Sequence, residues 1–354
     1  MPISIHLFGG TKGESVVLEL PDRSWGVVDC YTSSANVLDR NLPATFLKNQ
    51  DVSDLRFVCL THPHDDHFSG IMQLLENFNV EQFWHFDGVS PARLRDLIKA
   101  KLKEAKKDEE STGRKTNASE LARIWKEVHQ RSKERKLVIQ RLSLGHTCIP
   151  SEDGLGFKIE AIGPSPLQTQ RFEDLLKHSF DTNGNFLPTV NHRDPNLISC
   201  GILIEYGSTR VLLGGDIEDG GWKDLIDQRA FLVERINYVK VAHHGSPNGF
   251  VDGLWHLHTN KMEMTYKTLT PFRRYDLPKA STIDHIAGHG SQIFSAGSPY
   301  FDPKFVPNYV VSKKALDENK PTSSGMTSRI SMTFDDNGSL IGDIELDGDA
   351  TKIC

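Results

Sequence analysis

The stretch Thr61-His-Pro-His-Asp-Asp-His67 decides how this sequence is interpreted. It follows an apolar run, residues 55–60, that is typical of a buried β-strand. Three imidazoles and a carboxylate this close together are costly without a cation, because protonated rings repel one another and neutral rings need donors or metals. The alternative interpretation of this stretch is a polar surface loop that binds no metal. We expect the stretch to hold two neighbouring metal ions, the first on His62 and His64 and the second on Asp66 and His67.

Two later motifs can complete such a metal pair. One apolar strand ends in Gly214-Gly-Asp216, where the glycines allow a close backbone approach and Asp216 emerges at the strand tip. Another ends in Lys240-Val-Ala-His-His-Gly-Ser246. Adjacent residues near a strand end point to opposite sides. One of His243 and His244 would therefore coordinate, and the other would touch the substrate or protonate the leaving group; the sequence leaves open which.

Together, these stretches resemble the metallo-β-lactamase superfamily through its HxHxDH signature, its later Gly-Asp and its terminal histidine. Val27-Val-Asp29 also resembles the early strand of the family that ends in aspartate. The resemblance spans residues 3–246 and is most similar to the subgroup that contains the soluble domain of the bacterial DNA-uptake channel ComEC. It implies an α/β fold, an αββα sandwich with the metals at one edge of the two sheets.

This resemblance also implies a metal-dependent hydrolase. Asp216 would bridge two divalent ions, Zn²⁺ or Mn²⁺, because all the ligand atoms are nitrogen or oxygen. Two such ions lower the pKa of a bridging water toward neutrality and stabilise charge that develops in the transition state. Asp29 would orient a ligand histidine, and Ser246 would bind a phosphate oxygen. The expected catalytic residues are Asp66, His243 and His244.

One departure from the family pattern concerns a further histidine, which usually stands in a Gly-His-Thr context shortly before the Gly-Asp strand. Gly145-His-Thr147 has this context but lies too early, so His146 is expected to be structural or to support a ligand. At the expected distance stands His192-Arg-Asp-Pro-Asn-Leu-Ile-Ser199, whose Asn-x-x-Ser pattern resembles the ComEC subgroup. Three of its residues are candidate extra ligands or substrate contacts: His192, Asp194 and Asn196.

A basic segment interrupts the β-rich pattern. Residues 93–136 hold 15 Lys and Arg against 8 Asp and Glu, a net charge of +7, so the remainder carries −13 within a chain of net charge −6. Two helical patterns around a Ser-Thr-Gly breaker predict a charged helical hairpin, residues 91–136, inserted into a single domain, residues 1–354. One interpretation is a solvated charged face. The other is a basic arm that holds an anionic substrate or a protein partner.

The rest of the chain predicts short strands separated by Gly, Pro and Asp. Residues 313–354 predict a C-terminal loop and a β-hairpin with an Asn-Gly turn. The hydrophobic fraction of 38% over 354 residues suffices for a large core. We expect no membrane span, because no run of about 18 apolar residues occurs. Five scattered cysteines and no visible secretory signal predict a reducing, cytoplasmic location.

For the function, we favour phosphodiester cleavage of nucleic acid. The net charge excludes a globally basic, histone-type binder, but the basic segment can still guide a polyanion. Arg273-Arg274 is expected to be a solvated turn, with a substrate contact as the alternative. Two other functions stay open. One is a hydrolase of a small ester, lactone, thioester or amide on the same metals. The other is a non-catalytic subunit of a larger complex, whose metals are structural.

Overall fold

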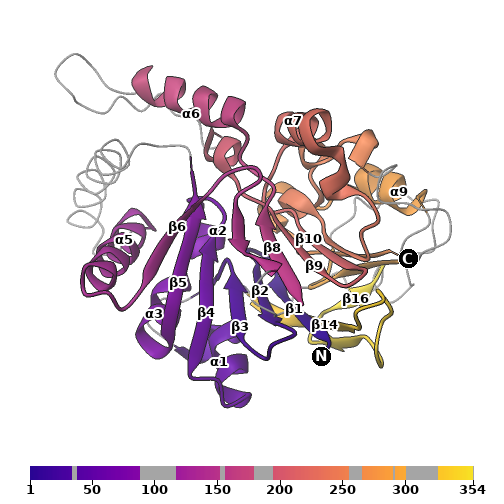
Figure 1. The fold of residues 1–354 in the computed structure, drawn as a ribbon. Coiled ribbons are helices and arrows are strands. Elements are labelled where there is room, and N and C mark those ends of the chain that lie inside the picture. Colours follow the sequence, from indigo (N-terminus) through magenta and orange to yellow (C-terminus); the bar gives the residue numbers. More distant parts are fainter. Residues whose placement is uncertain are drawn as a thin grey trace.

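The computed structural model describes residues 1–33, 38–87, 117–151, 156–178, 194–254, 265–289, 292–299 and 326–353. Within these residues, two mixed eight-stranded sheets face each other (Figure 1). The first sheet has the order β15-β14-β1-β2-β3-β4-β5-β6. Its strands are β1 (Ile3–Gly10), β2 (Ser15–Glu19), β3 (Trp25–Val28), β4 (Asp54–Leu60), β5 (Asn79–Phe86), β6 (Val138–Leu142), β14 (Met326–Phe334) and β15 (Glu345–Asp347).

The second sheet has the order β16-β13-β12-β11-β10-β9-β8-β7. Its strands are β7 (Thr147–Ile149), β8 (Phe157–Ala161), β9 (Ile202–Tyr206), β10 (Thr209–Leu213), β11 (Tyr238–Lys240), β12 (Tyr266–Leu269), β13 (Gln292–Ser295) and β16 (Thr351–Lys352). The largest hydrophobic core lies between the sheets and draws residues from both. Near its centre, the rings of Phe57 and Trp84 stack at 3.8 Å.

Helices cover the outer faces of both sheets and complete the αββα sandwich (Figure 1). The first sheet carries α1 (Leu42–Asn49), α3 (Ile71–Asn77) and α5 (Asn117–Lys133). The second carries α7 (Asp219–Arg229) and α9 (Ala280–Ala287), and α6 (Pro166–His178) contacts α7. The predicted fold class is therefore confirmed. In the part of the chain that the structure describes, no helix has the length and apolar character needed to cross a membrane.

Helix α5 belongs to the basic segment that the charge count singles out. It joins β5 to β6, which pair in parallel, and its apolar stripe packs against the first sheet. The buried positions are Leu121, Ile124, Trp125 and Val128. Residues 88–116, which include the first half of the predicted hairpin, lie outside the described residues. At the C-terminal end, β14 pairs with β15 in antiparallel register, and residues 313–325 of the predicted loop are not described.

The carboxyl ends of parallel strands meet at one edge of the sandwich. In the first sheet, β3 and β4 are parallel neighbours that lead into Asp29 and His62. In the second sheet, β10, β11 and β12 are parallel neighbours and lead into Asp216, His243 and Thr270. Because side chains that follow parallel strands converge on the same edge, the HxHxDH motif, the Gly-Asp motif and the His-His motif reach one place.

Candidate metal centre

The first motif forms a tight turn that leads into the short helix α2 (Asp65–Phe68). His62 and His67 are fully buried, whereas His64 is half-buried at the mouth of the centre. The His62 Nε2 atom lies 2.9 Å from His64 Nδ1 and 3.7 Å from Asp216 Oδ2. The predicted first pair is thus brought together and faces the predicted bridging carboxylate.

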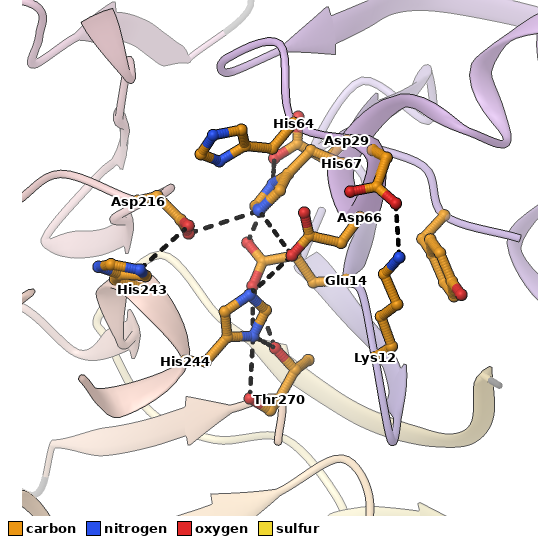
Figure 2. A network of polar contacts seen from close by, with 12 residues as sticks. Lys12, Glu14, Asp29, His64, Asp66, His67, Asp216, His243, His244 and Thr270 are labelled. Atoms are coloured by element: carbon orange, nitrogen blue, oxygen red, sulfur yellow. Dashed lines mark hydrogen bonds and ion pairs between the residues drawn. The ribbon is translucent and has the colours of Figure 1, made fainter. Parts of the chain in front are cut away.

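Asp29 fixes the His67 ring, as the sequence predicts for an orienting carboxylate. Its Oδ2 atom lies 2.7 Å from His67 Nδ1, and the Thr61 backbone N–H and hydroxyl both donate to the same carboxylate. This arrangement turns His67 Nε2 toward the centre, 3.5 Å from Asp216 Oδ1 (Figure 2). Burial raises the pKa of Asp29, although its contact with His67 works in the opposite direction.

Asp216 depends on the glycine before it. Gly215 has a φ of +51°, and a Cβ there would lie 2.8 Å from the Cys200 carbonyl oxygen. The turn therefore requires glycine. The backbone N–H of Asp216 donates to Ser199 Oγ at 2.9 Å. These contacts hold the Asp216 carboxylate between the histidines of the first motif and those that follow β11.

The two adjacent histidines take different places. His244 is fully buried; its Nε2 lies 3.3 Å from Asp66 Oδ2, and its Nδ1 lies 2.9 Å from Thr270 Oγ1. The side chain of His243 is 18% exposed, with Nε2 3.9 Å from Asp216 Oδ2 (Figure 2). Both residues have left-handed φ angles, 48° and 54°. Such strain is typical of functional sites, where the surrounding structure enforces it.

Two glutamates belong to this centre although the sequence did not point to their role. Glu14 comes from the loop between β1 and β2 and is buried; it accepts hydrogen bonds from Lys240 Nζ and, at 3.0 Å, from Thr270 Oγ1. Glu218 accepts from Asn196 Nδ2 at 2.9 Å, and its Oε1 lies 3.6 Å from His243 Nδ1. The only available signal was the proximity of Glu218 to Asp216 in the sequence.

The charges of the centre are strongly coupled. Burial, followed by the nearby rings of His67 and His64, holds the pKa of His62 well below its usual range. Burial also opposes protonation of His67, but the carboxylates of Asp216 and Asp29 outweigh it and raise the His67 pKa well above its usual range. Burial opposes ionisation of Asp216, and the surrounding histidines reverse that effect and lower its pKa.

The donor atoms fit divalent cations. His67 Nε2 and Asp216 Oδ1 are buried, and in the described part of the chain neither has a hydrogen-bond partner. Unpaired buried polar atoms are costly, so a cation between them accounts for their arrangement. Two groups of side chains have ligand atoms that all lie within 4.8 Å of one another, and Asp216 belongs to both. The groups are Glu14, His67, Asp216 and His244, and His62, His64 and Asp216.

The remaining predicted residues divide between the site and the rest of the fold. Asn196 and Ser246 line a cleft of about 650 Å³ above the centre, and Ser246 Oγ donates to Asn248 Oδ1. Asp194 lies in the 3₁₀ turn Asp194–Ile198, and His192 lies outside the described residues. His146 does not join the site, because it lies between β6 and β7 with Nε2 3.0 Å from Gln140 Oε1.

The fold and the buried His, Asp and Glu groups define a metal-dependent hydrolase. The family model of the Metallo-beta-lactamase superfamily matches residues 9–221, and the chain belongs to this superfamily. No curated protein matches the sequence.

Several solved structures share low similarity with the chain. The metallo-beta-lactamase fold protein YhfI from Bacillus subtilis has 13% identity and a TM-score of 0.40, with 85% of this chain and 98% of that chain covered. The Zn²⁺-bound PqqB from Methylobacterium extorquens has 9% identity and a TM-score of 0.39, with 79% and 84% covered. A diphosphatase from the PhnP family has 11% identity and a TM-score of 0.39, with 80% and 90% covered.

Proposed function

We propose that this protein hydrolyses phosphodiester bonds of nucleic acid with two divalent ions, Zn²⁺ or Mn²⁺. The observation that carries the proposal is Asp216, shared between two groups of ligand atoms at the floor of an open cleft. The phosphodiester part is supported by Lys279 and Ser246, a cation and a hydroxyl on the cleft wall. The resemblance of the motif order to the DNA-uptake channel subgroup supports the same choice.

We assign the ligands from their positions. His62 and His64 would hold the first ion, and Asp216 belongs to the ligand groups of both ions. Asp66, His67 and His244 would hold the second ion: Asp66 Oδ2 lies 3.8 Å from His67 Nε2 and 3.3 Å from His244 Nε2. Asn196 takes the place of the missing family histidine: it is buried, lines the cleft, and within the described residues its Oδ1 has no hydrogen-bond partner. Glu14 orients His244 through Thr270.

When bound, the ions would supply hydroxide at neutral pH and positive charge for the transition state. His243 faces the cleft beside Glu218, so it is the residue placed to give a proton to the leaving oxygen. Asp29 holds His67 in one tautomer and one orientation. Ser246 and Lys279 bind phosphate oxygens that do not react. The division of roles between His243 and His244 rests on their different burial.

The test combines metal analysis with a substrate panel. Elemental analysis should find two divalent ions per chain in the wild type and fewer in Asp216→Ala. The wild type should cleave DNA, RNA or a chromogenic phosphodiester with Mn²⁺ or Zn²⁺, and Asp66→Ala and Asp216→Ala should lose this activity while their circular dichroism is kept. Cleavage that persists in both variants would overturn the proposal.

The second candidate is hydrolysis of a small ester, lactone or thioester by the same centre. The apolar side of the cleft, formed by Phe272, Leu277 and Pro247, favours it. Turnover of p-nitrophenyl esters without turnover of phosphodiesters would select it. A protein partner for residues 91–136, a role as a non-catalytic subunit and a cytoplasmic location remain predictions.

A further inference from the structure

The segment that follows β12 forms one wall of the cleft. Phe272 lies beside the buried centre, with its ring centroid 5.1 Å from that of His244 in an edge-to-face contact. Tyr275 lies 5.1 Å from Phe272, also edge to face, and 43% of its surface is exposed. The aromatic surface therefore continues from the proposed metal ligand to the mouth of the cleft. Lys279 lines the same wall.

Hydrogen bonds hold this wall in place. The backbones of Phe272 and Leu277 donate to each other's carbonyl at 3.0 and 3.1 Å, which closes the turn Arg273–Tyr275. Arg273 N–H donates to the Thr11 carbonyl at 3.0 Å and so ties the turn to the loop that follows β1. Lys279 Nζ donates to the Tyr275 carbonyl at 3.0 Å. These hydrogen bonds therefore fix the conformation of the turn that carries Tyr275.

The positive charges around the aromatic surface indicate which kind of ligand it binds. The Arg274 guanidinium carbon lies 5.5 Å from the Tyr275 ring centroid, and the Lys279 ammonium is on the cleft wall. A planar base can stack on exposed aromatic rings, and base–aromatic stacking contributes about 1–3 kcal/mol per base. The two cations suit the phosphates on either side of that base. An aliphatic ester can pack against the aromatic rings, but it has no anionic group to pair with the two cations.

We propose that Phe272, Tyr275 and Lys279 form a nucleobase-binding rim, which stacks the base next to the scissile phosphate and contacts the neighbouring phosphate. This inference rests on the proposed function and names its substrate class more narrowly. The rim prefers phosphodiesters that carry a base over phosphodiesters that do not. The proposal also gives Arg273 and Arg274 a place beside the rim rather than in a purely solvated turn. Arg273 holds the turn through its backbone N–H, and Arg274 lies beside the Tyr275 ring.

The test compares two chromogenic phosphodiesters with the same leaving group: thymidine 5′-(p-nitrophenyl phosphate), which carries a base, and methyl p-nitrophenyl phosphate, which does not. The wild type should prefer the first in kcat/KM. Tyr275→Ala should lower this preference about tenfold, mainly through KM of the nucleotide substrate, and Tyr275→Phe should keep it. Phe231→Ala is the matched control, because Phe231 is an exposed aromatic residue, 58% exposed, in another turn.

A binding measurement separates failure of the rim from failure of the proposed function. Fluorescein-labelled oligothymidine is titrated into the Asp216→Asn background and followed by anisotropy. Tyr275→Ala should weaken binding about tenfold, and Lys279→Met should reduce the slope of log K against log salt by about 0.7. Unchanged binding and unchanged preference in Tyr275→Ala would overturn the rim. Oligonucleotide binding that depends on Tyr275, together with a wild type that cleaves neither DNA, RNA nor the chromogenic phosphodiesters, would instead overturn the proposed function and leave the rim standing.

Discussion

The carboxylate of Asp29 and the imidazole of His67 meet at 2.7 Å, Oδ2 to Nδ1, and this contact turns His67 Nε2 toward Asp216. Asp29 follows β3 and His67 lies in α2, so the contact joins two separate segments of the first sheet's edge. It also sets which ring nitrogen faces the centre. A carboxylate in this position raises the basicity of a ligand histidine and fixes its orientation.

Replacing this carboxylate should therefore weaken metal binding. Asp29→Asn keeps the size of the side chain and suits the left-handed φ of 55° at this position. We expect metal affinity to fall about 10- to 100-fold, measured by competition with a chelator. Asp51→Asn is the control, since Asp51 is exposed and has the same φ of 55°. Equal affinities in Asp29→Asn and wild type would contradict the assigned role.

An added methyl group at Gly215 should harm both the fold and the metal centre. Its φ is positive, and a Cβ would press against the Cys200 carbonyl and Ser199 Oγ. We expect Gly215→Ala to lower the free energy of unfolding by about 2 kcal/mol or more and to reduce metal content through displacement of Asp216. Gly253→Ala is the control, because among the described residues a Cβ there comes within 4 Å of Ile226 alone, at 3.6 Å. Urea unfolding and elemental analysis measure the two effects.

The buried ion pair of Lys240 and Glu14 joins the second sheet to the first. Lys240→Met should lower the free energy of unfolding of the metal-free protein by about 3–5 kcal/mol, because it leaves Glu14 buried without its cation. The double variant Glu14→Gln/Lys240→Met should recover a large part of this loss, since neither position then carries a buried charge. A double variant no more stable than Lys240→Met alone would refute the electrostatic explanation.

Two histidines outside the site, the half-buried His6 and the buried His85, predict a loss of stability in acid. Burial, reinforced by Arg329, lowers the pKa of His6 to about 3, and burial lowers the pKa of His85 to about 4. In the unfolded chain both rings bind protons near pH 6.5, whereas in the folded protein they stay neutral, so protons favour unfolding as the pH falls below 6.5. For each ring, this difference should lower the free energy of unfolding by about 2 kcal/mol between pH 7 and pH 5.

The contribution of His6 can be isolated by substitution. His6→Gln removes the titrating group, and we expect the free energy of unfolding of this variant to fall about 2 kcal/mol less than that of the wild type over the same pH range. Urea unfolding at pH 7, 6 and 5 measures the difference. If the free energy of unfolding changes equally with pH in the two proteins, the contribution assigned to His6 is wrong. The metal ligands are the same in both proteins, so their titration does not affect this comparison.

Local motifs were sufficient for most of the proposed ligands and, through the family that they resemble, for the fold class. The HxHxDH turn, the Gly-Asp strand end and the His-His strand end each lie within a few residues, so residue types and spacing reveal them. The stripe of α5 was equally readable, because its buried positions follow the helical period. The helix α7 was missed, since it begins with Asp-Gly-Gly, residues of low helix propensity. The strand β5 was also missed.

The sequence by itself supplied the histidines and aspartates of the site, because their residue types and spacing are local, and it gave the αββα class through the family that these motifs resemble. Only the tertiary structure decided that His244 is buried against Thr270 while His243 faces the cleft, and that Glu14 belongs to the centre. Glu14 lies 226 residues from Lys240 in the chain. A contact of that span leaves no local pattern, because it exists only once the two sheets have packed.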